Sequence, residues 1–209
     1  EAFLHLISRP ESERPEWTVW VSRRRNYFPI DDSTFTNEFF MPDYSDYFFR
    51  LSEDKRAEIN AAHLLTSDGI SESTLRSIYQ ELYRLQFLDG EERRFGLLPN
   101  RTVTAVDRAE GGWELSVRHN DELDQTHVGV DAIVWATGYR PAPKPFLGPL
   151  RDRIETENGE FRVGEDFAVD WDGPPDRNIF MQNAVRGQRG LPDINLSLNA
   201  WRARRIADR

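Results

Sequence analysis

The sequence predicts an α/β fold that carries a helical insert and a three-stranded β-meander. Three observations support this prediction. Apolar residues recur at helical spacing in the first half of the chain, apolar and polar residues alternate in the second half, and a nearly continuous apolar run at 131–138 ends in glycine. The chain has 209 residues, of which 38% are hydrophobic, so it can build one sizeable core or two small ones and is not a disordered chain.

A short helix and a short strand are expected at the start of the chain. The helical face at 1–8 is formed by Ala2, Phe3, Leu6 and Ile7. Residues 17–21 (Trp-Thr-Val-Trp-Val) predict a buried strand, and a helix, a loop and a strand are half of a βαβ unit. The turn-rich stretch 26–38 is long for a loop in a compact domain, which makes it a candidate functional loop.

Residues 38–90 are expected to form the helical insert. Helices are predicted over 42–51 and 52–65, with Ser52 as the N-cap of the second. A third helix is predicted over 73–88, because apolar side chains recur there at spacings of three and four. These side chains are Leu75, Ile78, Leu82 and Leu85.

The β-meander is predicted at 102–130. Its strands cover 103–107, 113–118 and 126–130, and Glu-Gly-Gly and Asn-Asp turns separate them. The apolar run that follows, 131–138, predicts a strand buried on both faces of a parallel sheet.

The last part of the chain is predicted to be mostly loop. Residues 141–178 are rich in proline, glycine and charge, and one short strand is expected near Phe161. Another short strand is predicted at 179–183, and the chain then ends in a helix over 195–207. Its inward-facing residues are expected to be Leu196, Leu198 and Trp201.

Composition excludes several classes of protein. The formal charge is −9, from 27 basic and 36 acidic residues, so neither nucleic acid nor a membrane is expected as a partner. The absence of cysteine excludes disulfide frameworks, thiolate zinc sites and thiol catalysis, and the four histidines lack metal-binding spacing. No apolar run reaches the roughly 18 residues of a membrane span, so we expect a cytoplasmic protein without a metal site. The oligomeric state stays open, a homo-oligomer included.

The first motif with chemical meaning is Ala-Thr-Gly-Tyr at 136–139. Ligands of open α/β sheets bind beyond the carboxyl ends of strands, and a small turn such as Thr137-Gly138 lets the backbone approach a cofactor closely. An ordinary glycine turn explains the motif equally well. The meander before it favours the cofactor, because a meander followed by a glycine-ended strand is typical of flavoproteins built from two dinucleotide-binding, Rossmann-like domains.

The second motif is Arg23-Arg24-Arg25, directly after the first strand. In a dinucleotide fold, arginine at this position accommodates the 2′-phosphate of NADP, whereas an acid binds the 2′-hydroxyl of NAD. The motif therefore favours NADPH, although charge runs are more often solvated turns.

Two further stretches are candidate sites. Polar residues at 31–38 and 66–70 either cap helices or contact a ligand. At 190–198 polar residues stand at a helix start, where free N–H groups stabilise negative charge such as that of a reduced flavin. Asn195 as a simple N-cap is the alternative.

Taken together, these stretches resemble the flavin-dependent N-hydroxylating monooxygenases of siderophore biosynthesis, the lysine/ornithine N-monooxygenase family. The resemblance extends in order over nearly the whole chain. The matching stretches read WVSRRRNYFPIDDSTFTNE at 20–38, LTSDGIS at 65–71, LLPNR at 97–101, ATGYR at 136–140 and DINLSLNAWR at 193–202. The sequence TSDGI at 66–70 resembles the lysine-acting branch, because ornithine-acting members tend to have Thr-Asn-Tyr-Ser there.

The resemblance implies a domain organisation. The chain begins with Glu1, and the glycine-rich FAD and NADPH loops of the family would lie upstream of it. We therefore expect the C-terminal half of a longer enzyme, which by itself would not turn over. Residues 1–138 would be the remainder of the NADPH-binding domain, including the insert and the meander. Residues 139–209 would be the C-terminal part of the FAD-binding domain.

The resemblance also implies roles for individual residues. Arg23 would contact the adenosine end of NADPH, and Thr137 and Gly138 would lie at the cofactor. The substrate amino acid would be held by Asn37, Glu38, Phe39 and Phe40. NADP and the substrate would be touched by Ser67, Asp68 and Gly69. The flavin would be contacted by Ile194, Asn195, Leu196 and Ser197, of which Ser197 also reaches the substrate.

One stretch departs from the family pattern. The family usually has a His-Gly pair before the flavin segment, whereas this chain has Arg186-Gly-Gln-Arg-Gly190.

The implied reaction is N6-hydroxylation of L-lysine. NADPH would reduce FAD, O2 would form a C4a-hydroperoxyflavin, and the neutral amine of lysine would take up the distal oxygen. L-Ornithine or a diamine as the substrate, another flavoprotein of this fold and a truncated non-catalytic fragment are the alternatives.

Overall fold

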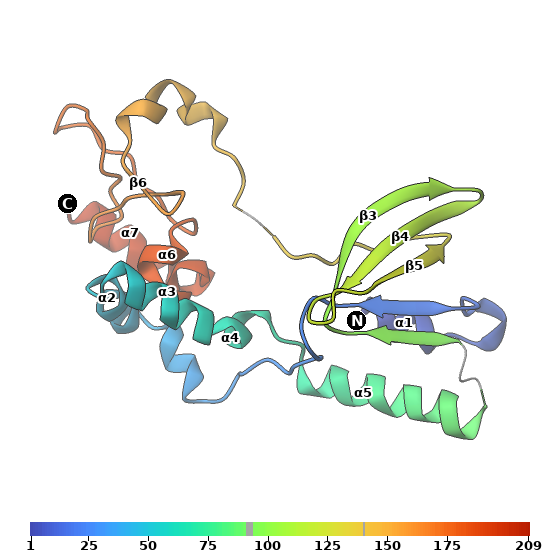
Figure 1. Ribbon diagram of the computed structural model, residues 1–209. Helices are drawn as coiled ribbons and strands as arrows, with labels where there is room; N and C mark the ends of the chain where they lie inside the picture. Colours follow the sequence, from blue (N-terminus) through green and yellow to red (C-terminus); the bar gives the residue numbers. More distant parts are fainter. Residues whose placement is uncertain (91–93, 140) are drawn as a thin grey trace. The chain divides into compact units, whose positions relative to one another are not determined.

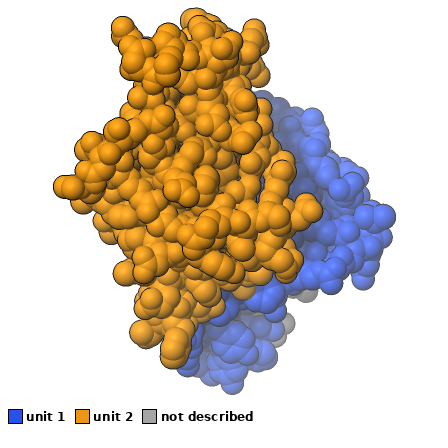
Figure 2. Space-filling model, turned by 90° about the vertical axis from the view of Figure 1, so that its left-hand side faces the viewer, with its two compact units in different colours: residues 1–30, 69–137 blue, residues 31–68, 138–209 orange. Residues whose placement is uncertain are grey.

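The computed structural model describes residues 1–90, 94–139 and 141–209 (Figure 1). The chain forms two compact units, which Figure 2 colours separately. Unit 1 comprises residues 1–30 and 69–137, and unit 2 comprises residues 31–68 and 138–209. Among the described residues, no helix is both long and apolar enough to cross a membrane.

The helices of unit 1 cover a short parallel sheet. Helix α1 (Ala2–Ile7) and strand β1 (Thr18–Val21) confirm the predicted start of the chain. Helix α5 (Glu72–Tyr83), capped by Ser71, continues into a π-helical turn (Arg84–Leu88). Strand β2 (Phe95–Leu98), which the sequence analysis missed, pairs in parallel with β1. The core between them contains Phe3, Ile7, Ile78, Leu82 and Leu85.

A three-stranded antiparallel sheet completes unit 1. Its strands, in order, are β3 (Arg101–Ala109), β4 (Gly112–His119) and β5 (Gln125–Val130). They cover the residues where the sequence predicts three strands. Gly111, in the turn between β3 and β4, has a φ of +82°, a conformation that favours glycine.

The strand predicted at 131–138 is wrong in this structure. The described residues of this stretch form no strand, and Val134 and Trp135 are 70% and 57% exposed. A strand buried on both faces needs neighbouring strands to satisfy its backbone, and no described residue pairs with this run. Gly138 has a φ of +82°, as a turn requires, and Arg140 lies outside the described residues.

Unit 2 joins a helical segment to the end of the chain. The helical segment contains a 3-10 helix (Thr36–Phe40), α2 (Pro42–Phe49), α3 (Glu53–Ala62) and α4 (Leu64–Asp68). The C-terminal segment contains a 3-10 helix (Pro145–Arg153), the hairpin strands β6 (Thr156–Glu157) and β7 (Glu160–Phe161), α6 (Arg186–Arg189), two 3-10 helices (Leu191–Ile194 and Leu196–Leu198) and α7 (Asn199–Ala207). Its apolar core contains Leu147, Ile154, Val163, Val169, Met181 and Val185.

One break between the two units lies at 137/138, beside the predicted boundary at 138/139, and the others lie at 30/31 and 68/69. The expected insert at 38–90 is divided, because its first helices pack with the C-terminal segment and α5 packs in unit 1. Two arginines of the C-terminal segment, the buried Arg189 and the partly exposed Arg205, hold this segment to the first helices. The Arg189 guanidinium lies between the rings of Phe49 and Phe167, at 4.1 and 4.4 Å from their centroids. Arg205 binds both carboxylate oxygens of Asp46, at 2.7 and 2.5 Å.

Two predictions for the C-terminal segment need correction. The strand predicted at 179–183 is a single bridge between Ala168 and Phe180. The predicted final helix begins later, at Asn199, and Leu196 is 66% exposed instead of facing inward. Arg202 is the residue of α7 that is fully buried, because it finds acceptors for its guanidinium inside the unit.

Candidate functional site

Most of the predicted site residues belong to unit 2. Asn37 to Phe40, Ser67, Asp68, Gly138 and Ile194 to Ser197 lie there, whereas Arg23, Gly69 and Thr137 lie in unit 1. The predicted substrate residues and the predicted flavin segment are therefore parts of the same compact unit.

Arg202 sets the shape of residues 190–197, the predicted flavin segment. Its guanidinium is fully buried and donates hydrogen bonds to the backbone carbonyl oxygens of Pro192 (3.0 Å), Asp193 (3.3 Å) and Asn195 (3.1 Å). It also donates to side-chain oxygens of Gln182, Asn183 and Asn199. Since these carbonyl groups point to Arg202, the segment keeps one backbone conformation.

Asp193 holds the same segment from the other side. Its carboxylate is buried and accepts the backbone N–H groups of Asn183 at 3.1 Å and Val185 at 2.9 Å. Burial raises the pKa of Asp193 above its usual range, while these N–H groups and the charge of Arg202 oppose the rise. The buried carboxylate of Asp193 and the buried guanidinium of Arg202 thus fix the segment together.

A glycine marks the start of the flavin segment. Gly190 has a φ of +70°, and a Cβ atom there would come within 3.1 Å of the Phe48 ring. Both the backbone conformation and the contact with α2 therefore favour glycine at this position.

Asn195 connects the flavin segment to the predicted substrate stretch. Its Oδ1 accepts the N–H of Ser197 at 3.0 Å, as expected for an N-cap, and its Nδ2 donates to the carbonyl oxygen of Phe40 at 3.4 Å. Ile194, Leu196 and Ser197 are exposed, so their side chains are available to a ligand.

The predicted substrate stretch is anchored by an aromatic stack. The ring of Phe39 stacks on His63, with centroids 4.2 Å apart and planes at 16°. The Tyr44 hydroxyl lies 3.4 Å from Nδ1 of His63. Burial lowers the pKa of His63, and the charge of Asp31 partly opposes this effect. Asn37 itself is exposed, and its backbone N–H donates to the carbonyl oxygen of Ser33.

Ser67 has an arginine as its partner. Nη2 of Arg186 donates to Oγ of Ser67 at 3.1 Å. The backbone oxygen of Arg186 accepts from Asn60 Nδ2 at 3.3 Å. Helix α4 also contacts the loop before the predicted substrate stretch, because the backbone N–H of Asp31 donates to the carbonyl oxygen of Leu65 at 3.0 Å.

These contacts form a closed circuit that we name the site ring. It runs through residues 36–40, 63–67, 186 and 190–197 and returns to Phe40 through Asn195. The sequence analysis did not assign a role to His63, Arg186, Asp193 or Arg202. The departure from the family pattern at 186–190 was the signal that could have drawn attention to Arg186.

The predicted residues of unit 1 lie on its surface or at close contacts. The Arg23 side chain is exposed after β1, and its guanidinium has no ion-pair partner among residues 1–90, 94–139 and 141–209. Its neighbour Arg25 binds Asp121 at 2.9 Å. Position 69 requires glycine because the backbone of Ile30 lies very close to it. A Cβ atom at this position would lie 2.1 Å from the Ile30 backbone. Thr137 is exposed.

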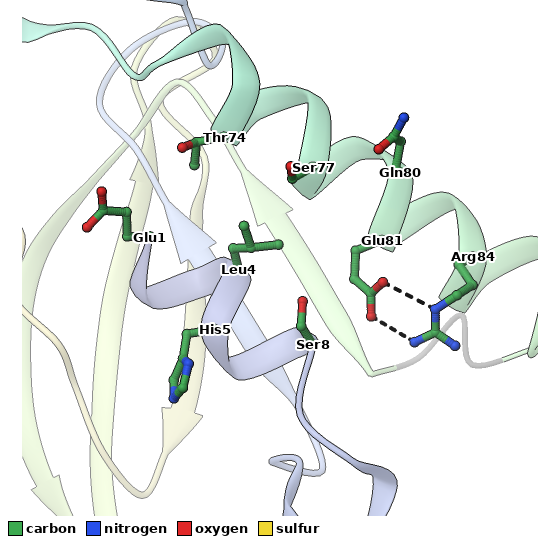
Figure 3. Close-up of a pocket in the computed structure, with 9 residues that line it drawn as sticks. All are labelled: Glu1, Leu4, His5, Ser8, Thr74, Ser77, Gln80, Glu81 and Arg84. Carbon is green, nitrogen blue, oxygen red and sulfur yellow. Dashed lines mark hydrogen bonds and ion pairs between the residues drawn. The ribbon is translucent and has the colours of Figure 1, made fainter.

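An open groove of unit 1 lies between α1 and α5 (Figure 3). It is lined by Glu1, Leu4, His5, Ser8, Thr74, Ser77, Gln80, Glu81 and Arg84. None of the predicted site residues is among them, so this groove is separate from the candidate site.

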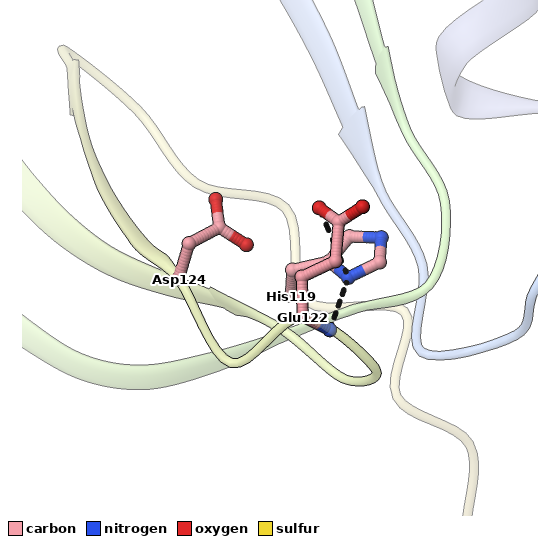
Figure 4. Close-up of side chains that lie close together, drawn as sticks. All are labelled: His119, Glu122 and Asp124. Atoms are coloured by element: carbon pink, nitrogen blue, oxygen red, sulfur yellow. Dashed lines mark hydrogen bonds and ion pairs between the residues drawn. The ribbon is translucent and has the colours of Figure 1, made fainter.

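A second cluster, of His119, Glu122 and Asp124, has metal-ligand side chains close together (Figure 4). However, Nδ1 of His119 accepts the backbone N–H of Glu122 at 3.0 Å. This hydrogen bond closes the turn between β4 and β5 and occupies the lone pair that a metal would need. The cluster is thus explained by the turn.

Comparisons with known proteins agree on one family. The model of the family described as L-lysine 6-monooxygenase/L-ornithine 5-monooxygenase matches residues 1–141. L-lysine N6-monooxygenase of Escherichia coli is 37% identical over 210 residues, which cover 100% of this chain and 49% of that protein.

Solved structures show the same fold. The ornithine hydroxylase PvdA from Pseudomonas aeruginosa has a TM-score of 0.79 at 25% identity, with 91% of this chain and 45% of that chain covered. DfoA, the FAD-bound cadaverine monooxygenase of desferrioxamine biosynthesis from Erwinia amylovora, has a TM-score of 0.78 at 27% identity and the same coverage. The chain thus spans about half the length of these relatives.

Proposed function

The chain belongs to the L-lysine 6-monooxygenase/L-ornithine 5-monooxygenase family. From this premise we propose a function for the full-length protein, by which we mean a protein that contains this chain and has the length of its relatives. That protein is an FAD- and NADPH-dependent monooxygenase of siderophore biosynthesis. It hydroxylates the side-chain amine of L-lysine and releases N6-hydroxylysine.

One observation carries the proposal. The stretch assigned to the substrate and the stretch assigned to the flavin are parts of one compact unit, and the Asn195–Phe40 hydrogen bond joins them. An amine held by Asn37 and a flavin held at 194–197 are therefore supported by the same rigid circuit. Rigid support of this kind is what a reaction between an amine and an activated oxygen needs.

The flavin segment suits FAD by its chemistry. The exposed apolar side chains of Ile194 and Leu196 offer a surface to a planar ring, and the Ser197 hydroxyl offers a hydrogen bond. The carbonyl oxygens that would repel a reduced, anionic flavin are turned toward Arg202. When bound, FAD supplies the oxygen activation and NADPH the electrons. Arg23, whose guanidinium has no carboxylate partner among the described residues, suits the 2′-phosphate of NADPH.

The substrate residues keep the amine reactive. A lysine amine has a pKa near ~10.4, and only its neutral form is a nucleophile. Neutral hydrogen-bonding groups such as those of Asn37 and Ser197 orient the amine without stabilising its ammonium form, as a carboxylate partner would. Thr137 and Gly138 lie at the cofactor in this account, and Ser67, Asp68 and Gly69 lie where NADP and substrate meet.

Lysine is the preferred substrate in this proposal for two reasons. Among the curated relatives, the identity to the lysine enzyme of Escherichia coli, 37%, is higher than the 27% to the L-ornithine N(5)-monooxygenase of Pseudomonas aeruginosa. The TSDGI stretch at 66–70 also resembles the lysine-acting branch.

The proposal is tested with the full-length protein. FAD binding is measured by fluorescence titration, and NADPH oxidation is then followed with lysine, ornithine, cadaverine and putrescine, with the hydroxylamine product quantified for each. We expect the highest kcat/KM for lysine. A higher value for ornithine or a diamine would contradict the substrate assignment, and no hydroxylamine from any amine would contradict the activity.

A further inference from the structure

Arg189 is a fully buried cation held between two aromatic rings. Its guanidinium lies 4.1 Å from the ring centroid of Phe49 in α2 and 4.4 Å from that of Phe167, in a loop that follows β7. Its Nη2 donates to two backbone carbonyl oxygens of the same loop, those of Gly164, at 2.8 Å, and Glu165. One side chain therefore joins α2 to this loop.

The charge of Arg189 is balanced inside the unit. Nη1 lies 3.6 Å from a carboxylate oxygen of Asp46, and neither Nε nor Nη1 has a hydrogen-bond partner among the described residues. The two ring faces and Asp46 therefore balance the charge. Burial lowers the pKa of Arg189 to about 10, and Asp46 opposes this effect, so the guanidinium stays charged at neutral pH.

The next residue, Gly190, begins the flavin segment and packs against the same helix. Phe48 of α2 is fully buried, and its ring lies where a Cβ atom of Gly190 would come within 3.1 Å. Two consecutive residues of α2 thus contact two consecutive residues of the C-terminal segment, because Phe48 faces Gly190 and Phe49 faces Arg189. This double contact fixes the start of the flavin segment relative to α2.

A row of aromatic rings connects this contact to the predicted substrate stretch. The ring centroids of Phe39 and Tyr44 are 5.1 Å apart, and those of Tyr44 and Phe48 are 6.1 Å apart. Both distances lie in the range of favourable aromatic pairs. The row therefore leads from the substrate stretch through α2 to Gly190, the residue that Arg189 directly precedes.

Two other arginines join the same parts of unit 2 at different places. Arg56 of α3 binds Glu157 of β6 at 2.5 Å, and Arg205 of α7 binds Asp46 of α2 at 2.5 Å. In the described parts of the chain, neither makes a hydrogen bond or an ion pair with the flavin segment. The place directly before the flavin segment distinguishes Arg189 from both.

We propose that Arg189 is a positioning residue, which holds Gly190 against Phe48 and thereby sets the distance between the bound flavin and the substrate amine. This inference rests on the proposed function and concerns the same site. Arg189 touches neither the flavin nor the substrate in this account, because it acts through Gly190. A misplacement of about 1 Å can cost roughly 100-fold in rate, so the reaction should respond to Arg189 more than substrate binding does.

The experiment compares the wild-type full-length protein with Arg189→Met, at a temperature where far-ultraviolet circular dichroism shows both to be folded. At saturating NADPH and lysine, the hydroxylamine formed per NADPH consumed is expected to fall roughly tenfold or more. NADPH, O2 and a proton would then give NADP+ and hydrogen peroxide. The lysine KM should stay within about threefold of wild type, since Arg189 does not contact the substrate. The visible circular dichroism of bound FAD should change, because it reports the surroundings of the flavin ring.

Two further variants separate positioning from stability. Arg56→Met removes another buried arginine that joins two segments of unit 2, so it should lower the urea midpoint. Its hydroxylamine yield per NADPH should nevertheless stay within about twofold of wild type, and its FAD spectrum should not change. Arg189→Lys keeps the charge without the planar set of N–H donors, so it should lose less hydroxylamine yield than Arg189→Met. This milder variant keeps the test decisive where Arg189→Met folds poorly.

A wild-type yield and an unchanged FAD spectrum in the Arg189 variants would overturn the inference, as would an equal loss of yield in Arg56→Met. A loss confined to the Arg189 variants supports it. The FAD spectrum is measured without turnover. A wild-type protein that forms no hydroxylamine, but whose FAD spectrum changes in the Arg189 variants and not in Arg56→Met, would therefore refute the proposed reaction and support the positioning role.

Discussion

The side-chain amide of Asn195 donates to the backbone carbonyl oxygen of Phe40 at 3.4 Å, across 155 positions of the sequence. One end of this bond lies in the segment assigned to the flavin and the other in the stretch assigned to the substrate. Arg202 and Asp193 fix the first segment, and the Phe39–His63 stack anchors the second. The distance between the two segments is therefore set by the fold of unit 2.

Asn37→Ala in the full-length protein should raise the lysine KM strongly while NADPH oxidation continues without hydroxylation. The side chain of Asn37 is exposed, and its backbone bond to Ser33 does not need the amide, so the fold should persist. Lysine saturation and the ratio of hydroxylamine formed to NADPH consumed check this. Thr34→Ala, in the same exposed loop, is the control, and an unchanged lysine KM in Asn37→Ala would reject the assignment.

Arg23→Ala should reduce the preference for NADPH over NADH. The charge of Arg23 is not neutralised by a carboxylate in the described parts of the chain, so it is free for a 2′-phosphate. The two kcat/KM values are compared with those of Arg25→Ala, which removes an arginine already paired with Asp121. Equal losses with both nucleotides would count against a phosphate contact.

Arg202→Met should destabilise the protein and weaken flavin binding together. The substitution leaves buried carbonyl groups without donors and Asp193 without its nearby charge, for which a loss of about 3–5 kcal/mol in unfolding free energy is expected. Urea unfolding and FAD titration measure the two effects. Arg204→Met, at an exposed pair with Asp208, should cost less than about 1 kcal/mol. Equal effects of the two variants would refute the role of Arg202.

His63 should make stability depend on pH. Because burial lowers its pKa in the folded chain, the unfolded chain binds the proton more readily. Its contribution to stability is therefore complete above the ordinary pKa, about 6.5, and is lost as pH falls through the lower folded value. Urea midpoints of wild type and His63→Gln should diverge less at pH 5 than at pH 8. A difference that grows on acidification would contradict the direction of the shift.

Elements with a clear local pattern could be predicted from the sequence. Helix α5 carries Ile78 and Leu82 at helical spacing, and both are buried in the structure. Strand β2 escaped because Phe-Gly-Leu-Leu is short, lacks alternation and exists through its parallel partner β1. The run at 131–138 has the composition of a buried strand, but composition does not provide the neighbouring strands that such a strand needs.

The candidate site, too, could be predicted only where a local sequence pattern exists. Motifs predict a site around Asn37 and Ser197, whereas periodicity predicted an inward Leu196, which is exposed, and gave no reason to bury Arg202. A buried arginine depends on acceptors from distant residues such as Gln182 and Asn183, which no local pattern reveals. For the same reason, the Arg186–Ser67 contact required the structure.

The central claim is that one lysine and one flavin meet at the site ring. A structure of the full-length protein with FAD, NADP+ and lysine tests it most directly. We expect Asn37 and Ser197 within hydrogen-bonding distance, about 3 Å, of the bound lysine, with residues 194–197 against the flavin ring. Lysine bound away from both side chains, or a flavin that does not touch 194–197, would contradict the account.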